Sequence, residues 1–316
     1  MKKKVLIADD MHPSILTMLE ELGFLPDYQP NIQRPELLNI IKDYEGLLIR
    51  SKTKIDKEFL SHNQKLAFIG RAGAGLDLID IEAVEQLGIK LFAANEGNSD
   101  AVAEHTLGML LSLFNKINWA DAEVRQKIWL REANRGIELK GMTVGIIGYG
   151  NMGKTLSERL IGFGVEVLAY DRYKTGFSSN LVKEVEMDEI FEKADVLSLH
   201  VPLNPSTKML INDDYLAKFK KNIFLINTSR GEVASVASVL KHLQNGKLRG
   251  ACLDVLENEK MKQLSAEQES QYDQLFQLKN VILTPHIAGW TVESYQKIND
   301  VLIEKIKAMY CIDLKI

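Results

Sequence analysis

Cysteine and long apolar runs are both scarce in this sequence. Only Cys252 and Cys311 occur among 316 residues, and they match no metal-binding spacing. With so few thiols, we expect reduced cysteines in a cytoplasmic protein, and no metal site. The apolar residues behind the N-terminal lysines are too few for a signal peptide or for a membrane helix, which needs roughly 20. A membrane partner is therefore not expected.

An excess of basic residues is missing as well. The chain has 39 Lys and Arg against 43 Asp and Glu, a formal net charge of −4. A nucleic acid-binding surface needs a basic face, so this balance argues against a nucleic-acid partner. The hydrophobic fraction of 46% and the charged fraction of 26% are ordinary for a globular protein. The length is sufficient for two domains.

Short apolar runs alternate with helical patterns from end to end. The first third has four such runs, at 4–10, 46–51, 65–73 and 89–95, with helical patterns at 14–22, 34–44 and 77–88. A second set of runs follows at 142–150, 165–171, 195–202, 223–229, 249–255 and 280–286. Most of them are continuously apolar, which is typical of parallel strands covered on both faces. The pattern predicts an α/β fold with two doubly wound parallel-sheet domains.

A long helix is predicted at 99–126, between the two sets of strands. Its apolar residues extend well beyond one face, so it is expected to be covered on two sides. Either a central core helix or a subunit interface would explain that pattern. Residues 291–310 predict a terminal amphipathic helix, and the polar stretch 257–274 predicts a long loop or an inserted helix.

The segment GIIGYGNMG contains the pattern G-x-G-x-x-G between an apolar strand and a helical stretch. Gly148 allows a tight turn, Gly150 lets backbone N–H groups approach a pyrophosphate, and Gly153 lets helix and strand pack closely. Asn151 and Met152 lie between the last two glycines, at the start of the helix. We therefore predict a dinucleotide site at these five residues.

The second strand of this predicted unit ends in Asp171. A carboxylate there accepts hydrogen bonds from the adenosine ribose and repels a 2′-phosphate, so NAD is favoured over NADP. Arg172 beside it weakens that preference a little.

Three further signals stand after predicted strands, where open α/β sheets bind their ligands. They are Arg230, the carboxylates of LDVLENE, and His286. Taken singly, each has a structural explanation: a salt-bridge arginine, a solvated acidic loop, and a hydrogen-bonded histidine. Together, in the sheet that carries a dinucleotide loop, they match the needs of hydride transfer from a 2-hydroxy acid. Arg holds the substrate carboxylate, His takes the hydroxyl proton near pH 7, and a carboxylate orients the imidazole.

The order of these motifs resembles the D-isomer-specific 2-hydroxyacid dehydrogenase family. The segments that carry the resemblance are GIIGYGNMG, LHVPLNPST, INTSRGEV, GACLDVLENE and LTPHIAG. Upstream, IRSKTKID, GRAGAGLDLIDIEA and NEGNSDAVAEHTLGMLLSL resemble that family's phosphoglycerate dehydrogenase branch. The resemblance implies that Arg230 carries the substrate, His286 is the acid/base and Glu259 is its carboxylate partner, with Glu257 as the competing candidate.

The resemblance also implies residues for the rest of the site. The nicotinamide half of the cofactor site would be lined by Thr207, Thr228, Ser229 and Asp254, with His200 and Pro202 near the adenine. Loop capping is the structural alternative for Asp254 and Thr207. Substrate-binding residues would be Gly73 and Ala74 at the carboxylate, and Arg50, Ser51 and Asn98 at a phosphate or other distal group. Lys52 would add charge there or lie in solvent.

At the level of the whole chain, the resemblance implies a Rossmann-type NAD domain at 98–287 inserted in a flavodoxin-like substrate domain at 1–97 plus 288–316. It implies a homodimer formed through the long helix after Asn98. The activity implied is NAD-dependent oxidation of 3-phosphoglycerate to 3-phosphohydroxypyruvate, the entry to serine synthesis. Because the sequence ends at Ile316, no appended regulatory domain and no inhibition by serine through one are expected.

The chain departs from the family pattern near the predicted site. Lys260 stands where a proline usually follows the catalytic Glu, the loop before His286 is longer than usual, and Trp290 replaces a small hydroxyl residue. A bulky aromatic there would narrow the cleft or change the substrate. Two alternatives therefore remain: a glyoxylate, hydroxypyruvate or D-lactate reductase, and an NAD-sensing, corepressor-like binding protein without turnover.

Overall fold

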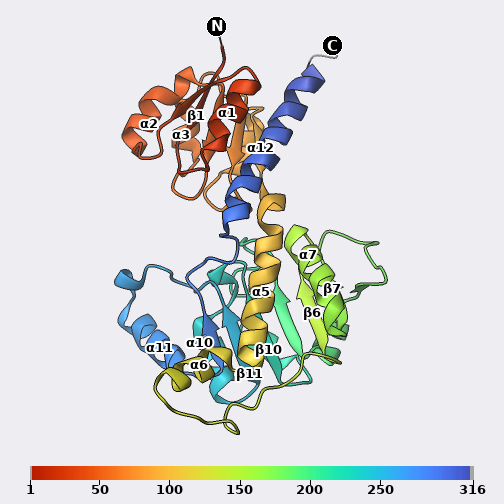
Figure 1. Ribbon diagram of the computed structural model, residues 1–316. Helices are drawn as coiled ribbons and strands as arrows, with labels where there is room; N and C mark the ends of the chain where they lie inside the picture. The colour runs from red at the N-terminus through yellow and green to blue at the C-terminus, as the bar shows by residue number, and fades with distance from the viewer. Residues whose placement is uncertain (1, 314–316) are drawn as a thin grey trace. The chain divides into compact units, whose positions relative to one another are not determined.

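The computed structural model describes residues 2–313 (Figure 1). The chain divides into two compact units. Unit 1 comprises Met1–Ser99 and Trp290–Ile316, and unit 2 comprises Asp100–Gly289. Unit 2 is thus an insertion into unit 1. Within residues 2–313, no helix combines the length and the apolar character that a membrane crossing requires.

Unit 1 contains a five-stranded parallel sheet with the strand order β2-β1-β3-β4-β5. Its strands are β1 Lys4–Ile7, β2 Leu25–Tyr28, β3 Gly46–Ile49, β4 Phe68–Arg71 and β5 Lys90–Ala93. This order is the flavodoxin-like one, and it confirms the expected class of the first domain. The sequence pattern did not predict β2, which contains Pro26 and lies at the edge of the sheet, where a missing N–H is tolerated.

Helices cover both faces of this sheet. Because side chains alternate along a strand, Val5 and Ile7 pack with the first and last helices of the unit, whereas Leu6 packs with the others. The first group is α1 Ser14–Glu21 and α12 Val292–Asp313; the second is α2 Arg34–Ile40, α3 Lys57–Ser61 and α4 Ile81–Gln86. The 3₁₀ turns are η1 Ile41–Asp43 and η2 Asn95–Asn98.

Unit 2 contains a seven-stranded parallel sheet with the order β12-β11-β10-β9-β6-β7-β8. Its strands are β6 Thr143–Ile147, β7 Glu166–Tyr170, β8 Lys183–Glu184, β9 Val196–Leu199, β10 Ile223–Asn227, β11 Leu248–Leu253 and β12 Val281–Leu283. The order reverses between β6 and β9, which is the Rossmann arrangement and the place where such sheets bind dinucleotides. The predicted Rossmann-type fold is confirmed.

Both faces of the second sheet are also covered. One face packs against α5 Ser99–Phe114 and α7 Asn151–Leu160. The other packs against α8 Met187–Lys193, α9 Asp213–Ala217, α10 Val236–Gln244 and α11 Ala266–Phe276. The 3₁₀ turns are η3 Ile161–Phe163, η4 Gly231–Val233 and η5 Met261–Gln263. Two-sided burial explains the continuously apolar strands.

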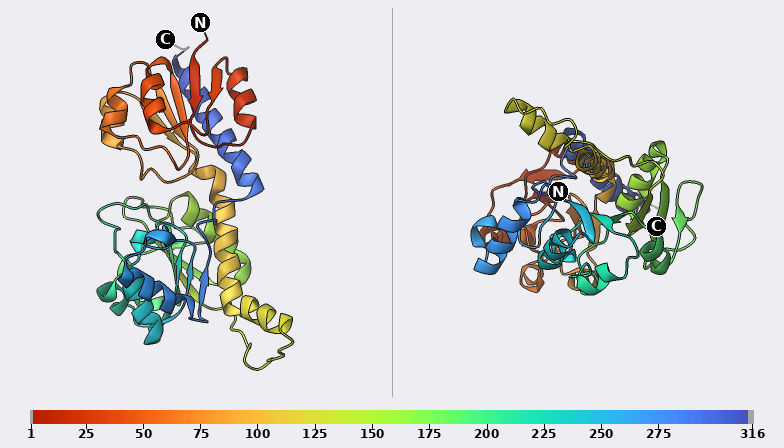
Figure 2. Two further views of the ribbon diagram at one scale, coloured as in Figure 1. Left: turned by 90° about the vertical axis from the view of Figure 1, so that its left-hand side faces the viewer. Right: turned by 90° about the horizontal axis from the view of Figure 1, so that it is seen from below.

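The prediction of one helix at 99–126 was wrong. The chain forms α5 and then a separate helix, α6 Ile117–Arg125, with Lys116 between them in a left-handed conformation at φ 52°. The carbonyl of Phe114 accepts a hydrogen bond from the N–H of Ile137 at 3.1 Å, so a later segment takes the acceptor near the end of α5. In the left view of Figure 2, α6 and the loop behind it turn away from α5.

Candidate active site and dinucleotide site

Arg230, Asp254 and His286 all follow neighbouring strands of unit 2. Arg230 comes after β10, Asp254 directly after β11, and His286 after β12. These strands are adjacent and parallel, so their carboxyl ends lie at one edge of the sheet. Three segments distant in sequence therefore meet at the edge where open α/β sheets bind ligands.

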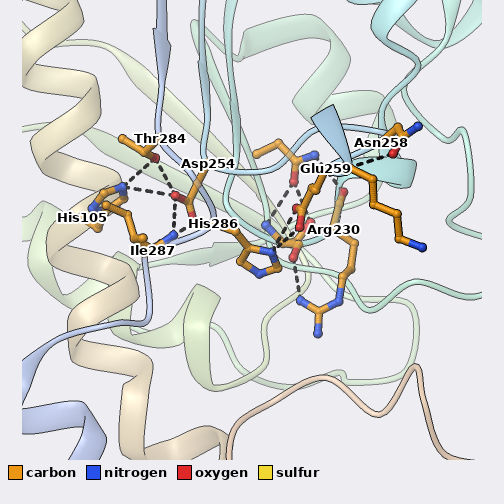
Figure 3. A network of polar contacts seen from close by, with 12 residues as sticks. His105, Arg230, Asp254, Asn258, Glu259, Thr284, His286 and Ile287 are labelled. Carbon is orange, nitrogen blue, oxygen red and sulfur yellow. Dashed lines mark hydrogen bonds and ion pairs between the residues drawn. The ribbon is translucent and has the colours of Figure 1, made fainter. Parts of the chain in front are cut away.

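The imidazole of His286 faces the carboxylate of Glu259 (Figure 3). Its Nδ1 lies 3.0 Å from both Oε1 and Oε2 of Glu259. Each side chain is 46% exposed, so the pair is accessible to a small molecule. A carboxylate on Nδ1 selects the tautomer with hydrogen on that nitrogen and stabilises the imidazolium. This arrangement suits an acid–base catalyst acting through Nε2.

The backbone of His286 is left-handed, at φ 56°, a conformation that only a few per cent of non-glycine residues adopt. The buried Asp254 holds this turn in place. Its carbonyl accepts from the N–H of His286 at 2.7 Å, and its carboxylate accepts from the N–H groups of Ile287 at 2.9 Å and Ala288 at 2.8 Å. Asp254 thus makes the loop-capping contacts considered for it, and through them it sets the position of His286.

His105 is a polar neighbour of Asp254 and Thr284, and no sequence motif predicted a role for it. Its Nε2 lies 3.0 Å from the hydroxyl of Thr284 and 3.6 Å from Oδ1 of Asp254, and the Thr284 hydroxyl donates to the same Oδ1 at 2.5 Å (Figure 3). His105 comes from α5, far from these residues in sequence. The only available signal was a histidine within an otherwise apolar helical pattern.

Arg230 begins the turn η4 after β10. Its Nη1 donates to the carbonyl of Ser229 at 2.7 Å, and its own carbonyl accepts from the side-chain amide of Asn227 at 2.9 Å. A Cβ on the next residue, Gly231, would lie 1.8 Å from the carbonyl oxygen of Leu256, so only glycine allows this close approach. The guanidinium is therefore oriented by its own loop.

Glu257 occupies a different place from Glu259. Its Oε2 accepts from the N–H of Val236 at 3.2 Å, in the first turn of α10, where the helix dipole favours an anion. The structure brings Glu259, and not Glu257, to His286.

The glycine loop joins β6 to α7 at the point where the strand order reverses. Gly148 has φ 93°, and a Cβ there would lie 2.3 Å from the carbonyl of His200. A Cβ on Gly153 would lie 2.1 Å from the carbonyl of Gly148, whereas one on Gly150 would meet no atom within 4 Å. The space above Gly150 and the N–H groups of Asn151 at the helix start fit a pyrophosphate.

The carboxylate of Asp171 lies at the end of β7, next to this loop. Its Oδ2 accepts from the N–H of Tyr149 at 2.7 Å, and its Oδ1 accepts from the N–H groups of Tyr173 at 2.9 Å and Lys174 at 3.0 Å. Oδ2 accepts only the one bond from Tyr149 and keeps a second lone pair for a ribose hydroxyl. The residues of the loop and of Asp171 therefore fit a dinucleotide.

The remaining predicted cofactor residues make local contacts. Burial lowers the pKa of His200 to about 4, so its imidazole is neutral near pH 7, with Nε2 2.9 Å from the Ser198 hydroxyl. The Thr207 hydroxyl donates to the carbonyl of Pro202 at 2.6 Å, which is the loop-capping role. The Thr228 hydroxyl lies 3.3 Å from the Thr106 hydroxyl. The Ser229 hydroxyl donates to Oδ1 of Asn227 at 2.8 Å. Within residues 2–313, no group of three or more His, Cys, Asp or Glu is placed to hold a metal ion.

In unit 1, Arg50 belongs to an aromatic cluster with Trp290, Tyr295, Tyr28 and Asp10. The guanidinium carbon lies 3.8 Å from the ring centre of Trp290 and 5.7 Å from that of Tyr295. Asp10 accepts hydrogen bonds from the hydroxyls of Tyr295 at 2.7 Å and Tyr28 at 3.0 Å. Burial lowers the pKa of Arg50, while Tyr295, Asp10 and Asp9 act to raise it.

The other predicted substrate residues of unit 1 lie in its loops. Ser51 and Ala74 are exposed, and Gly73 is buried at φ 127° with the Arg71 guanidinium against it. Asn98 ends η2, and its Oδ1 is buried without a hydrogen-bond partner within the described part of the chain. Lys52 donates to the carbonyls of Pro30 and Ile32, at 2.6 and 3.2 Å, so its ammonium is tied to its own unit. These residues stay predictions.

The fold and the site of unit 2 define a dinucleotide-binding domain with an acid–base pair at the ligand edge of its sheet. Residues 107–288 match the family model described as D-isomer specific 2-hydroxyacid dehydrogenase, NAD binding domain. The chain therefore belongs to the D-isomer specific 2-hydroxyacid dehydrogenase family, and NAD is confirmed as the cofactor of this domain.

Known proteins similar to the chain differ in their names. D-3-phosphoglycerate dehydrogenase of Methanocaldococcus jannaschii is 35% identical over 307 residues, 96% of this chain and 57% of that protein. The chain thus spans little more than half of that relative. Hydroxypyruvate reductase of Thermotoga maritima is 34% identical over 304 residues, 96% of this chain and 97% of that protein. The solved D-lactate dehydrogenase of Aquifex aeolicus, complexed with NAD and lactic acid, is 27% identical with a TM-score of 0.82, over 99% of this chain and 97% of that one.

Proposed function

We propose that this protein is an NAD-dependent oxidoreductase that transfers a hydride between a D-2-hydroxy acid and NAD. The observation that carries the proposal is the contact of His286 Nδ1 with Glu259 at 3.0 Å, on the sheet edge to which Arg230 also belongs. Arg230 binds the substrate carboxylate through its fork of N–H donors. His286 takes the hydroxyl proton at Nε2, because Nδ1 faces Glu259, and the carboxylate stabilises the imidazolium that forms. Bound NAD supplies the hydride acceptor.

The test is the substitution His286→Ala. Removal of a general acid/base lowers turnover by roughly 10²- to 10⁴-fold. Because the glycine loop is untouched, the Kd for NADH, measured by fluorescence titration, should stay within about twofold of the native value. His62→Ala serves as a control, since this histidine is exposed at the end of α3 in unit 1. Unchanged turnover in His286→Ala would reject the catalytic assignment.

For the substrate, we propose 3-phosphoglycerate, oxidised to 3-phosphohydroxypyruvate at the entry to serine synthesis. Support comes from the phosphoglycerate dehydrogenase relative and from Arg50, a cation with small donors near it in sequence. NADH formation with D-3-phosphoglycerate should be compared with NADH consumption on phosphohydroxypyruvate, glyoxylate, hydroxypyruvate and pyruvate. Arg50→Ala should then impair the phosphorylated pair selectively. Equal losses for unphosphorylated acids would reject Arg50 as a phosphate ligand.

A reductase of unphosphorylated 2-oxo acids is the second candidate. Its support is the hydroxypyruvate reductase relative, of which the chain covers 97%, and the Trp290 ring against Arg50. Activity confined to unphosphorylated acids would favour this candidate.

An NAD-sensing binding protein without turnover is a candidate of another class. The presence of Arg230, Glu259 and His286 argues against it, because a sensor has no use for an acid–base pair. NADH binding without hydride transfer across the panel of acids would favour the sensor.

We further propose a homodimer formed through α5 and the segment that follows it. The support is a set of exposed apolar side chains in one stretch of chain, at Ile117, Val124, Ile128, Trp129 and Leu130. Trp129 is 81% exposed, and α6 buries none of its residues. Light scattering should report a dimer for the native chain and a monomer for Trp129→Asp. A cytoplasmic location, expected from the low cysteine content, stays a prediction.

A further inference from the structure

Tyr272 lies in the core of unit 2 and bonds to the residue before Glu259. Its side chain is 1% exposed. Its hydroxyl accepts a hydrogen bond from the N–H of Asn258 at 2.8 Å and donates to the carbonyl of the same residue at 3.1 Å. One hydroxyl thus satisfies both backbone groups of Asn258. A buried tyrosine needs such partners, because an unpaired hydroxyl in the core is costly.

The position of this hydroxyl is set by the core. Tyr272 belongs to α11 and to the same apolar cluster as Leu275 and the strand residue Leu253. Its ring centre lies 5.8 Å from that of Phe276. Close-packed cores hold their side chains in single rotamers. The hydroxyl is therefore a hydrogen-bond partner of fixed position for the loop that contains Asn258.

The side chain of Asn258 binds the same loop a second time. Its Nδ2 donates to Oε1 of Gln268 at 3.1 Å, and its Oδ1 accepts from the N–H of Lys260 at 3.0 Å. Gln268 in turn forms the capping box of α11 with Ser265. A proline at position 260 has no N–H, so the bond to Lys260 is one that the usual family residue cannot make. Glu259 stands between the two residues held in this way.

We propose that Tyr272 is a positioning residue for Glu259: its hydroxyl fixes the backbone of Asn258, so that the Glu259 carboxylate meets Nδ1 of His286. The proposal rests on the acid–base roles given above to His286 and Glu259. Through this contact the inserted helix α11 acts on the reaction without touching the substrate. The stretch between Glu259 and His286, which is longer than usual for the family, contains α11 and so supplies Tyr272.

The charges around the Tyr272 hydroxyl are compatible with its neutral form. Burial raises the pKa of Tyr272, its bond with the Asn258 backbone lowers it, and the nearby carboxylates of Glu257, Glu259 and Glu232 raise it. With its pKa raised above the usual value, Tyr272 is protonated near pH 7 and can donate its hydrogen bond. The groups that face His286 are the Glu259 carboxylate and, through the backbone, Asp254.

The experiment compares kcat and KM of Tyr272→Phe with those of the native enzyme. This change removes only the hydroxyl and with it both hydrogen bonds to the Asn258 backbone, so we expect kcat to fall about 5- to 20-fold, with KM changed less than about twofold. A merely structural role would lower kcat whichever residue stands at position 259, so the double variant of Tyr272→Phe with Glu259→Gln should be no slower than Glu259→Gln alone. Tyr215→Phe is the matched control. Tyr215 is also a largely buried tyrosine of unit 2, but its hydroxyl lies 3.8 Å from the sulfur of Met187.

Glu259→Gln separates failure of this proposal from failure of the proposed function. If Glu259→Gln lowers kcat and Tyr272→Phe does not, the positioning role is overturned while the acid–base pair stands. If Glu259→Gln leaves kcat unchanged, the roles of the pair themselves fail. Should Tyr272→Phe not fold, Asn258→Pro is compared with Asn258→Ala: both lose the side-chain bonds to Gln268 and Lys260, but only proline lacks the N–H that binds the Tyr272 hydroxyl. Equal kcat in these two variants would then overturn the proposal.

Discussion

The guanidinium carbon of Arg50 lies 3.8 Å from the ring centre of Trp290. The two residues come from the two separate segments of unit 1, and Tyr295 adds a second aromatic ring edge-on to Trp290 at 5.0 Å. A guanidinium against an aromatic face keeps its N–H donors in its own plane, where a carboxylate or phosphate binds. Trp290, which was expected to narrow the cleft or change the substrate, is in contact with Arg50, the cation proposed to bind the distal phosphate.

Trp290→Ser should weaken substrate binding more than turnover. An exposed cation–π contact is worth about 0.5–1 kcal/mol, so we expect KM for phosphohydroxypyruvate to rise about 2- to 5-fold with kcat nearly unchanged. Steady-state kinetics on the best acid of the panel measures both constants. Val292→Ser, at a position that is 86% exposed, is the control. A lower KM in Trp290→Ser would show that the indole obstructs the substrate instead of orienting Arg50.

Asp254→Asn should cost both stability and activity. An amide has one acceptor oxygen, so one of the N–H groups of Ile287 and Ala288 loses its partner, at a cost of about 1–3 kcal/mol. Turnover should fall because the left-handed turn at His286 is then held less firmly. Asp195→Asn is the matched control, since Asp195 accepts from the N–H of Thr143 at the start of β6. Denaturant midpoints and kcat for both variants provide the comparison, and equal kcat in the two would contradict the role of Asp254.

Gly150→Ala and Gly153→Ala should separate binding from stability. A methyl group at position 150 would meet no protein atom within 4 Å, so the free energy of unfolding should change by about 1 kcal/mol or less. The Kd for NADH should rise at least about tenfold, because the methyl group would occupy the space proposed for the pyrophosphate. At position 153 the methyl group would lie 2.1 Å from the Gly148 carbonyl, and overpacking of this kind costs about 1–3 kcal/mol. Calorimetry of binding and urea unfolding measure the two effects. Tight NADH binding in Gly150→Ala would place the pyrophosphate elsewhere.

The lowered pKa of His200 leads us to expect that the stability of the protein without cofactor depends on pH. Its folded pKa is about 4, below the value of about 6.5 in an unfolded chain, so between these values the unfolded state binds more protons. Stability is therefore lost as pH falls through this window, by about 1–2 kcal/mol from this residue at pH 5. His200→Gln, which cannot take up the proton, should lose less stability than the native protein between pH 7 and pH 5. Urea midpoints at the two pH values test this, and parallel losses would contradict it.

Much of the architecture follows from local pattern in the sequence. Strands such as β6 and β10 are buried along their whole length, and their continuous apolar runs made both parallel sheets predictable. The end of α5 was not predictable, because the N–H that binds the Phe114 carbonyl comes from Ile137, beyond the helix. The edge strand β2 was not predicted, because Pro26 argues against a strand unless the strand is known to lie at the edge of the sheet.

For the site, motif order identified the residues but not their contacts. The resemblance favoured Glu259 and kept Glu257 as the competing candidate, because the sequence does not show which carboxylate of the loop after β11 reaches His286. His105 meets Asp254 only because α5 packs on the sheet, so nothing next to it in sequence reveals the contact. The same holds for Arg50 and Trp290, which lie near opposite ends of the chain.

The insertion of unit 2 into unit 1 has a consequence for synthesis on the ribosome. Residues 100–289 are complete before residues 290–316 emerge, so unit 2 has all of its strands while unit 1 still lacks α12. Until α12 is made, the sheet face that contains Val5, Ile7 and Phe68 is not covered by Leu302 and Ile306 of that helix. The strands of unit 1 that are made before unit 2 thus keep an uncovered apolar face until α12 follows, so a delay in the synthesis of unit 2 prolongs their exposure.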